Sequence, residues 1–499
     1  MRQPYVVVGS AACACLVVLG LALGGGSSGA GNAAARQLQT AIFAPAHLQT
    51  AVFDPAAFAG PDAAVAFSHA RATGATVARL LVDWSTVAPA EPRASSDPGN
   101  PSNPAYNWGP VDRQVRLSLR AGLQPVLCIL NPPVWARTPA ANGSTVLPQM
   151  RSADDYGKFM LAAARRYSGT FSGLPRVRYW QVLNEPNLSF YLDPQYMNGQ
   201  PASPAVYRQL VNAAADAVHS VHRDNLVIAG GLSPFGRNDA ATNPEKSAIV
   251  ISPMRFMRGL LCMSEGEQPK PTCGDQVRFD VWSHHPYTSG GPGHHADAKD
   301  DVSLGDLPEM KALLDAAVKA GHVRSNGPVR FWVDEFSWDS NPPDPGGVPA
   351  TLEAQWISEA MYEMWQTGIS LVTWFLIRDT AHYQSGLYQA GSSVAADKPK
   401  ATVAAFRFPF VGHMLKGKVT VWGRTPWGKP GRVLVEELTK AGWKPLGTVR
   451  TSRFGILRET FQAPLGTYVR ARLLGKDGLA SVPFPLAGPR QIPASPFGS

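Results

Sequence analysis

From about residue 48 to residue 410, short apolar runs rich in β-branched and aromatic residues alternate with longer segments of helical periodicity. The apolar runs predict eight strands: one in the segment L-Q-T-A-V-F-D-P that starts at Leu48, and others at 76–84, 124–130, 179–183, 225–230, 279–284, 329–335 and 370–377. The periodic segments predict helices at 61–73, 110–121, 152–167, 203–222, 253–261, 307–320, 351–366 and 400–410. Ser152 is a candidate N-cap, and Gly122 follows a helix end.

Strands that are apolar along their whole length and joined by helices belong in a parallel sheet covered on both faces. Eight such units predict an α/β fold, a (β/α)8 TIM barrel, which we place at residues 38–415. Beyond it, short alternating segments separated by Gly, Pro and Lys turns predict a small antiparallel β-sandwich over 416–499. We expect Trp422, Trp427 and Trp443 to be structural there, and glycan binding by them stays open.

The first 37 residues have a different character. Arg2 precedes an apolar run from Tyr5 to Leu23, which small residues follow. A basic start, an apolar core and small residues are the layout of an export signal, so we expect a secreted or extracytoplasmic protein. The run of about 19 residues is also long enough for an uncleaved membrane anchor, and both outcomes stay open.

The composition indicates a globular chain, with 44% hydrophobic and 17% charged residues among 499. Its length suits two or three domains. The formal charge of +9 includes no basic cluster, so we expect no nucleic-acid partner. We expect the protein to be a monomer.

Five cysteines are present, and their positions suggest different roles. Cys13 and Cys15 lie in the N-terminal apolar run, and Cys128 lies in an apolar strand, where we expect a buried free thiol. Cys262 and Cys273 flank a polar loop and predict a disulfide in an oxidising compartment. Zinc binding is a poorer interpretation, because no other His or Cys lies near them at ligand spacing.

Two predicted strands end in carboxylates. The run Y-W-Q-V-L stops at Asn184-Glu185-Pro186, where proline cannot donate to a strand ladder. The run R-F-W-V ends at Asp334-Glu335. Because side chains alternate along a strand, we expect these two to point to opposite sides, with only Glu335 facing the barrel mouth. By the strand count Glu185 and Glu335 end strands four and seven. A pair of carboxyl groups across a cleft is the smallest set of side chains that glycosidases use to cleave a glycosidic bond.

The motifs W-Q-V-L-N-E-P-N and W-V-D-E-F-S-W resemble the fourth- and seventh-strand motifs of retaining glycoside hydrolases of clan A, nearest to families 39 and 5. The resemblance implies that Glu335 is the nucleophile and Glu185 the acid/base, with no metal or organic cofactor. Family 5 members often carry a His at the end of strand three, where this chain has L-N-P-P, so the resemblance favours family 39.

The resemblance also implies substrate-binding roles. Asn184 would bind the sugar's 2-hydroxyl, and His285 would lie near the acid/base. Tyr287 would hydrogen-bond Glu335, and Arg79 would keep that carboxylate charged. A further group of tryptophans completes the assignment: Trp374 as the aromatic floor under the sugar, and Trp135 and Trp338 as further sugar platforms.

Each assignment has a plainer alternative. The Asn-Glu-Pro stretch can be a turn, and the Asp-Glu pair can cap a helix. Arg79 can pair with Asp83 or Asp112 between elements. His284, His285, His294 and His295 are enough in number for a metal site, but no nearby carboxylate has evident ligand geometry. Each tryptophan that follows a predicted strand (Trp84, Trp108, Trp135 and Trp338) can be plain packing.

We therefore expect a secreted retaining glycoside hydrolase that acts on an oligosaccharide or polysaccharide by double displacement. This mechanism needs the two carboxyl groups about 5–5.5 Å apart. Two other functions stay open: a non-catalytic barrel that binds polysaccharide at the cell surface, and a transglycosylase that uses an acceptor sugar in place of water.

Overall fold

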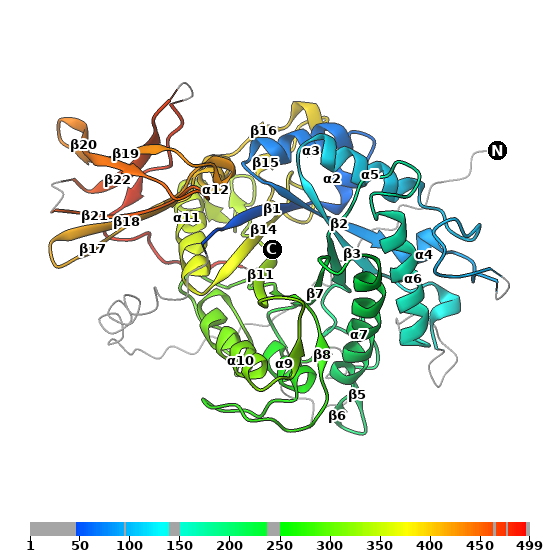
Figure 1. Ribbon diagram of the computed structural model, residues 1–499. Coiled ribbons are helices and arrows are strands. Elements are labelled where there is room, and N and C mark those ends of the chain that lie inside the picture. The colour runs from blue at the N-terminus through cyan, green and yellow to red at the C-terminus, as the bar shows by residue number, and fades with distance from the viewer. Residues whose placement is uncertain are drawn as a thin grey trace. The chain divides into compact units, whose positions relative to one another are not determined.

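The computed structural model describes residues 46–93, 96–138, 150–236, 250–462, 466–475 and 478–495. A closed barrel of eight strands lies at its centre, in the order β1-β14-β11-β9-β7-β4-β3-β2 (Figure 1). Neighbouring barrel strands are parallel. The barrel strands are β1 (Gln49–Phe53), β2 (Val77–Asp83), β3 (Gln124–Leu130), β4 (Tyr179–Val182), β7 (Leu226–Leu232), β9 (Val281–His284), β11 (Arg330–Phe336) and β14 (Ile369–Phe375).

Helices follow the strands and surround the barrel (Figure 1). They are α2 (Pro55–Ala59), α3 (Ala63–Ala72), α4 (Trp84–Val87), α5 (Gly109–Arg120), α6 (Ala153–Arg166), α7 (Ser203–Val221), α9 (Pro253–Leu261), α10 (Leu307–Lys319), α11 (Ala350–Gln366) and α12 (Ala401–Arg407). Two-residue pairings join β5 (Tyr196–Met197) to β6 (Gln200–Pro201), β8 (Val277–Arg278) to β10 (Val323–Arg324), β12 (Ser340–Asn341) to β13 (Val348–Pro349) and β15 (Tyr388–Gln389) to β16 (Lys398–Pro399). The predicted α/β barrel is confirmed.

Local signals explain several boundaries. The Ser152 hydroxyl accepts a hydrogen bond from the Asp154 N–H at 3.0 Å, which confirms the predicted cap of α6. Asp54 caps the unpredicted helix α2 in the same way, through the Ala57 N–H at 2.9 Å. Gly122 follows α5 with a positive φ of 78°, a conformation that glycine adopts without strain.

Two apolar clusters form around the barrel wall. The smaller cluster fills the barrel interior and consists of Ala51, Val77, Val126, Leu226, Ile228, Val281, Trp332 and Leu371, with Tyr179 packed against it. The larger one joins the outer face of the strands to the helices. Residues on one strand therefore alternate between a filled interior and the helix layer, as in other α/β barrels.

Two antiparallel sheets follow the barrel in sequence. One has the order β17-β18-β21 and the other β20-β19-β22-β23. Their strands are β17 (Phe410–Leu415), β18 (Lys418–Arg424), β19 (Arg432–Thr439), β20 (Gly442–Arg450), β21 (Ile456–Gln462), β22 (Tyr468–Leu473) and β23 (Phe484–Pro485). The predicted helix ran to residue 410 and hid the start of β17, whereas the observed helix α12 ends at Arg407 and β17 begins at Phe410. Trp422 is buried in this region, and the half-buried Trp427 donates to the Arg71 carbonyl at 3.1 Å. The predicted domain division at 415 stays a prediction.

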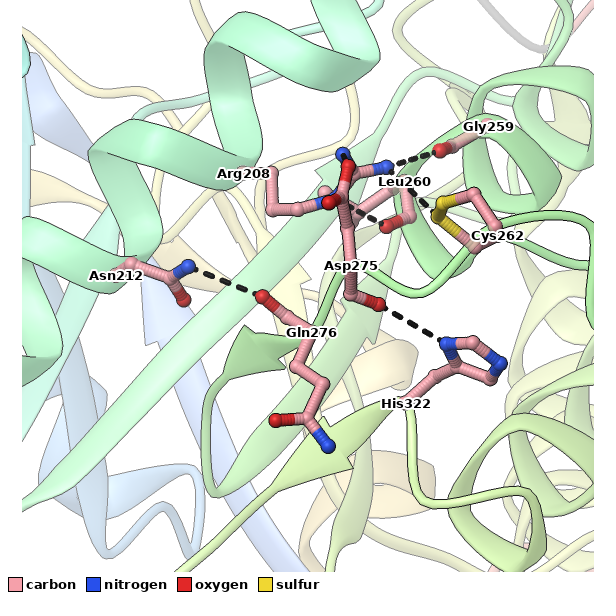
Figure 2. The surroundings of a disulfide bond; sticks show 9 residues. Arg208, Asn212, Gly259, Leu260, Cys262, Asp275, Gln276 and His322 are labelled. Carbon is pink, nitrogen blue, oxygen red and sulfur yellow. Dashed lines mark hydrogen bonds and ion pairs between the residues drawn. A yellow bond between two sulfur atoms is a disulfide. The ribbon is translucent and has the colours of Figure 1, made fainter.

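The predicted disulfide between Cys262 and Cys273 is present, with the Cα atoms 5.3 Å apart. Arg208 of α7 contacts the same region, donating from Nε to the Leu260 carbonyl at 2.9 Å and from Nη1 to Asp275 at 2.7 Å (Figure 2). Cys128 is a buried free thiol, as predicted.

The predicted export signal or anchor, including Cys13 and Cys15, lies outside the described residues. Within the described ranges, no helix combines the length and the apolar character that crossing a membrane requires.

Candidate active site

The carboxyl ends of the barrel strands carry a connected group of polar side chains around Arg79. This arginine lies on β2 and is only 1% exposed. It donates from Nε to Gln181 Oε1 at 2.8 Å, from Nη1 to Glu335 Oε2 at 2.8 Å and from Nη2 to Asn184 Oδ1 at 2.6 Å. Its guanidinium carbon lies 4.4 Å from the ring centre of Phe53. One cation therefore fixes side chains that come from three other barrel strands.

The alternative pairing of Arg79 with Asp83 or Asp112 is not observed. Asp112 instead accepts from Arg166 Nε at 2.8 Å. Asp83 accepts from the Asn131 amide at 2.9 Å.

Glu335 is held by two donors. Its Oε2 accepts from Arg79, and its Oε1 accepts from the Tyr287 hydroxyl at 2.9 Å. The side chain is 12% exposed. The predicted contacts of Arg79 and Tyr287 with Glu335 are therefore both present.

Glu185 lies just beyond β4 on a tightly turned backbone. Leu183 and Glu185 have positive φ angles of 59° and 40°. Non-glycine residues in this region carry strain of about 1–3 kcal/mol, which proteins retain mainly at functional sites. The Glu185 N–H donates to the Gly231 carbonyl at 2.9 Å, and its Oε1 lies 3.0 Å from His285 Nδ1. Burial raises the pKa of Glu185, with the hydrogen bond from His285 opposing that rise.

His285 lies between two carboxyl groups. Its Nδ1 contacts Glu185, and its Nε2 lies 3.4 Å from Asp334 Oδ1, an ion-pair distance longer than a good hydrogen bond. Burial alone would lower the pKa of His285, but the charges of Glu335 and Asp334 outweigh it and raise the pKa to about 10. Burial likewise opposes ionisation of Asp334, yet His285 and Arg79 hold its pKa below the usual value.

The expectation that Asp334 and Glu335 point to opposite sides is wrong. Both carboxylates contact Arg79, Asp334 at 3.8 Å and Glu335 at 2.8 Å. The reason is a register shift: three residues of β11, from Val333 to Phe336, advance along only two residues of β14. Such a bulge interrupts the alternation of side chains and turns two successive residues toward the same region.

Sequence reasoning missed Asp334 and Gln181 as members of this site. The Gln181 amide donates to Asp334 Oδ2 at 2.6 Å while its carbonyl oxygen accepts from Arg79. Both residues are buried. The available signal was Gln181 itself, a polar side chain in an otherwise apolar strand, because a buried amide requires partners.

The structure does not bring Trp374 and Trp338 into this cluster. Both are fully buried. Trp374 packs against Phe406 of α12, so it lies on the outer face of the barrel, and its Nε1 donates to the Ser385 carbonyl at 2.7 Å. The next residue, Phe375, is half-buried and lies 5.7 Å from Phe53, ring centre to ring centre. Alternation along β14 therefore corrects the expected aromatic from Trp374 to Phe375.

Trp135 lines a different hollow. Together with Tyr106 and Phe159 it borders a cavity of about 440 Å³ that none of the residues around Arg79 lines. Its Nε1 donates to the Ala88 carbonyl at 2.9 Å. Trp84 and Trp108, which also follow predicted strands, are buried. A role of Trp135 in substrate binding stays a prediction.

The four histidines do not form a metal site in the described part of the chain. Among those residues, the one group of three or more whose potential ligand atoms lie close together is Cys262, Cys273 and Asp275, and its two sulfurs form the disulfide. His285 contacts Glu185, whereas His295 pairs with Asp306 at 2.6 Å.

No protein-family model matches the chain, and no curated protein matches it. The chain is structurally similar, at low sequence identity, to solved (β/α)8 glycosidases. A family 39 glycoside hydrolase from Bacteroides cellulosilyticus WH2 is 15% identical, with a TM-score of 0.48 over 84% of this chain and 81% of that one. A GH39 β-xylosidase from Caulobacter crescentus is 13% identical, with a TM-score of 0.46 over 85% and 94%. A GH30 endoxylanase from Clostridium papyrosolvens C71 is 11% identical, with a TM-score of 0.41 over 84% and 94%. Similarities this distant assign neither a family nor an activity.

Proposed function

We propose that this protein is a retaining glycoside hydrolase in which Glu335 is the nucleophile and Glu185 is the acid/base. The observation that carries the proposal is the opposite environment of the two carboxyl groups. Glu335 is bound by a cation and a hydroxyl donor, which suits a charged nucleophile. Burial raises the pKa of Glu185, which suits a proton donor. Two carboxyl groups whose environments separate their protonation states are the acid and base arrangement of glycosidases.

The reaction would proceed in two displacements. Glu335 attacks the anomeric carbon and forms a glycosyl ester while Glu185 gives its proton to the departing oxygen. Glu185, now a carboxylate, then removes a proton from water, which attacks the same carbon and releases Glu335. The sugar retains its configuration because the carbon is inverted twice. The chemistry uses carboxyl groups alone and calls for no cofactor.

Neighbouring residues would hold the sugar. The Asn184 carbonyl oxygen accepts from Arg79, so the group it offers a sugar hydroxyl is the Nδ2 donor. The buried ring of Phe53 lies beside Arg79, and the half-buried ring of Phe375 lies 5.7 Å from that of Phe53. Apolar faces of a sugar can pack on such rings. We propose an oligosaccharide or polysaccharide as the substrate class.

The first test is a panel of aryl glycosides and defined oligosaccharides, assayed with the wild type and Glu335→Gln. We expect Glu335→Gln to lower turnover by several orders of magnitude. The matched control is Glu353→Gln, because Glu353 is also buried but lies on α11 and contacts none of the residues around Arg79. Glycan binding without turnover in the wild type would instead support a binding barrel.

The second test identifies the nucleophile and the stereochemistry. A 2-fluoro glycoside with a good leaving group should leave its sugar on the peptide that contains Glu335, as seen by mass spectrometry. The first anomer released, measured by proton NMR, should match that of the substrate. Labelling elsewhere, or the opposite anomer, would refute the double displacement. Transfer to an added sugar in preference to water would indicate a transglycosylase.

We also propose that the protein is exported. The N-terminal sequence has the layout of a signal, and a disulfide such as Cys262–Cys273 suits an oxidising compartment. Fractionation of cells with an antibody to the chain, with intact-mass analysis of the mature form, would test export and cleavage together.

A further inference from the structure

We propose that Asp334 is a positioning residue that keeps His285 doubly protonated, and that this charge directs the acidic proton of Glu185 toward the substrate. The inference rests on the proposed function and extends it to a residue that does not itself react. The structural basis of this inference is a series of contacts that leads from Gln181 through Asp334 and His285 to Glu185.

The contacts place a carboxylate behind the histidine. Gln181 Nε2 donates to Asp334 Oδ2 at 2.6 Å, and Arg79 fixes Gln181 from the other side. The other Asp334 oxygen, Oδ1, faces His285 Nε2 at 3.4 Å. Among the described residues, neither of these two atoms has a partner at ordinary hydrogen-bond geometry, although the Ser283 hydroxyl also helps to hold the pKa of Asp334 low. Asp334 therefore has one oxygen held in place and one directed at the imidazole.

Gly231 makes this arrangement possible. A Cβ at this position would lie 2.8 Å from Gln181 Nε2, 3.1 Å from Asp334 Oδ2 and 3.5 Å from His285 Nε2. The φ of +58° also disfavours any other residue. The backbone of β7 thus leaves room for the three side chains to meet, while its carbonyl at the same residue holds the Glu185 N–H.

The protonation of His285 decides which oxygen of Glu185 carries the proton. An ionised Asp334 only accepts, so Nε2 must carry hydrogen. If His285 were neutral, Nδ1 would be bare, and the Glu185 proton would point at it from Oε1. When His285 is charged, Nδ1–H donates to Oε1 at 3.0 Å instead. The acidic proton is then left on Oε2, the oxygen available to a departing group.

Charge balance supports the same conclusion. Before attack, Arg79 and His285 are positive, Asp334 and Glu335 are negative, and Glu185 is neutral, so the cluster has no net charge. In the glycosyl ester, Glu335 is neutral and Glu185 is negative, and the cluster is again uncharged. A neutral His285 would leave one uncompensated negative charge at both stages, which is costly in a buried site.

The charged groups around His285 come from three barrel strands. Glu185 follows β4, Asp334 and Glu335 lie on β11, and Arg79, which contacts both Asp334 and Glu335, lies on β2. On its own strand, His284 Nε2 donates to the Val302 carbonyl at 2.9 Å, and burial lowers the pKa of His284 to about 3, so it adds no charge. With Glu185 neutral, two carboxylates against one arginine leave one negative charge, which favours a cation at position 285.

The direct test is NMR of the free protein labelled with ¹⁵N-histidine, with His285 assigned by its loss in His285→Asn. We expect both ring nitrogens of His285 to carry protons at pH 8 in the wild type, and one of them to lose its proton in Asp334→Asn. Asp280→Asn is the matched control, because Asp280 forms another contact with a histidine, the partly buried His219, at 2.9 Å. A neutral His285 in the wild type at pH 8, or a charged one in Asp334→Asn, would overturn the inference.

The functional test compares leaving groups. Both glycosides carry the sugar that the panel identifies. For the phenyl glycoside, whose leaving group needs a proton, Asp334→Asn should lower kcat/KM about 10²-fold or more. For the 2,4-dinitrophenyl glycoside, whose leaving group needs none, the loss should stay within about tenfold. Equal losses on both substrates would refute a positioning role. His285→Gln should show the same selectivity and serves if Asp334→Asn does not fold. A wild type inactive on every glycoside would refute the proposed function, while the NMR result would still decide the charge of His285.

Discussion

Replacing Arg79 with glutamine removes the cation that contacts Glu335. The arginine is 1% exposed and Glu335 is 12% exposed, so water can compensate only slightly for the loss. Breaking a buried ion pair by removing one partner costs about 3–5 kcal/mol, because the remaining charge is left unpaired. Since Glu335 retains some exposure and the Tyr287 hydroxyl, we expect a loss in the free energy of unfolding near the lower end, about 3 kcal/mol at pH 7.

This loss should depend on pH. Arg79 helps to hold the pKa of Asp334 below its usual value, so its removal lets the folded variant bind a proton more readily than the folded wild type does. Because the folded variant binds more protons than the folded wild type, its stability relative to the wild type rises as the pH falls. The difference between the two proteins should be largest near pH 7 and smaller near pH 5.

Urea unfolding followed by tryptophan fluorescence measures these differences. The decisive comparison is a double-mutant cycle with Glu335→Gln, in which the cost of Arg79→Gln should fall by at least about 1 kcal/mol. Arg424→Gln is a matched control, because Arg424 is equally buried but donates to the Leu48 carbonyl at 2.6 Å. If Arg79→Gln costs the same with and without the Glu335 carboxylate, and at both pH values, the assignment of Arg79 as its counter-charge is wrong.

Three further outcomes are expected. Because burial raises the pKa of Glu185, kcat/KM should fall on the alkaline side as that proton is lost, and Glu185→Gln should abolish this limb of the pH profile. Joint replacement of Cys262 and Cys273 by serine should lower the free energy of unfolding by about 3 kcal/mol, given their separation of 11 residues, as measured in urea. Trp374→Ala should lower the free energy of unfolding by about 3–5 kcal/mol, because the side chain is fully buried. Phe375→Ala should mainly raise KM, and the reverse pattern would contradict the placement of these two rings.

The barrel could be predicted from the sequence because its signals are local. Alternation of apolar strands with periodic helices is visible within 10 to 20 residues of chain. The predicted strand 124–130 and the predicted helix 253–261 coincide with β3 and α9. The two strand-end motifs also marked the region where Glu185 and Glu335 share neighbours.

The remainder of the site depends on register between strands, which no single segment encodes. Asp334 and Glu335 both reach Arg79 because β11 advances by one extra residue against β14. An alternation rule applied to β11 alone could not include this shift. From Leu371 to Phe375, by contrast, β14 pairs with β1 without a shift, and alternation there turns Phe375 rather than Trp374 toward Phe53.

The sequence analysis did not establish which side chains of each strand point into the barrel. Polar residues within apolar strands supply this information. Tyr179 and Trp332 belong to the interior cluster, and the residues two positions further along, Gln181 and Asp334, hydrogen-bond each other. Arg79 likewise lies two positions beyond Val77, a residue of the interior cluster on β2. A glutamine, an aspartate and an arginine buried at one level of a barrel are expected to bond one another, because buried polar groups almost always have hydrogen-bond partners. Their co-occurrence therefore indicates which face of each strand is internal, and it identifies from the sequence the polar layer next to the two proposed catalytic carboxylates.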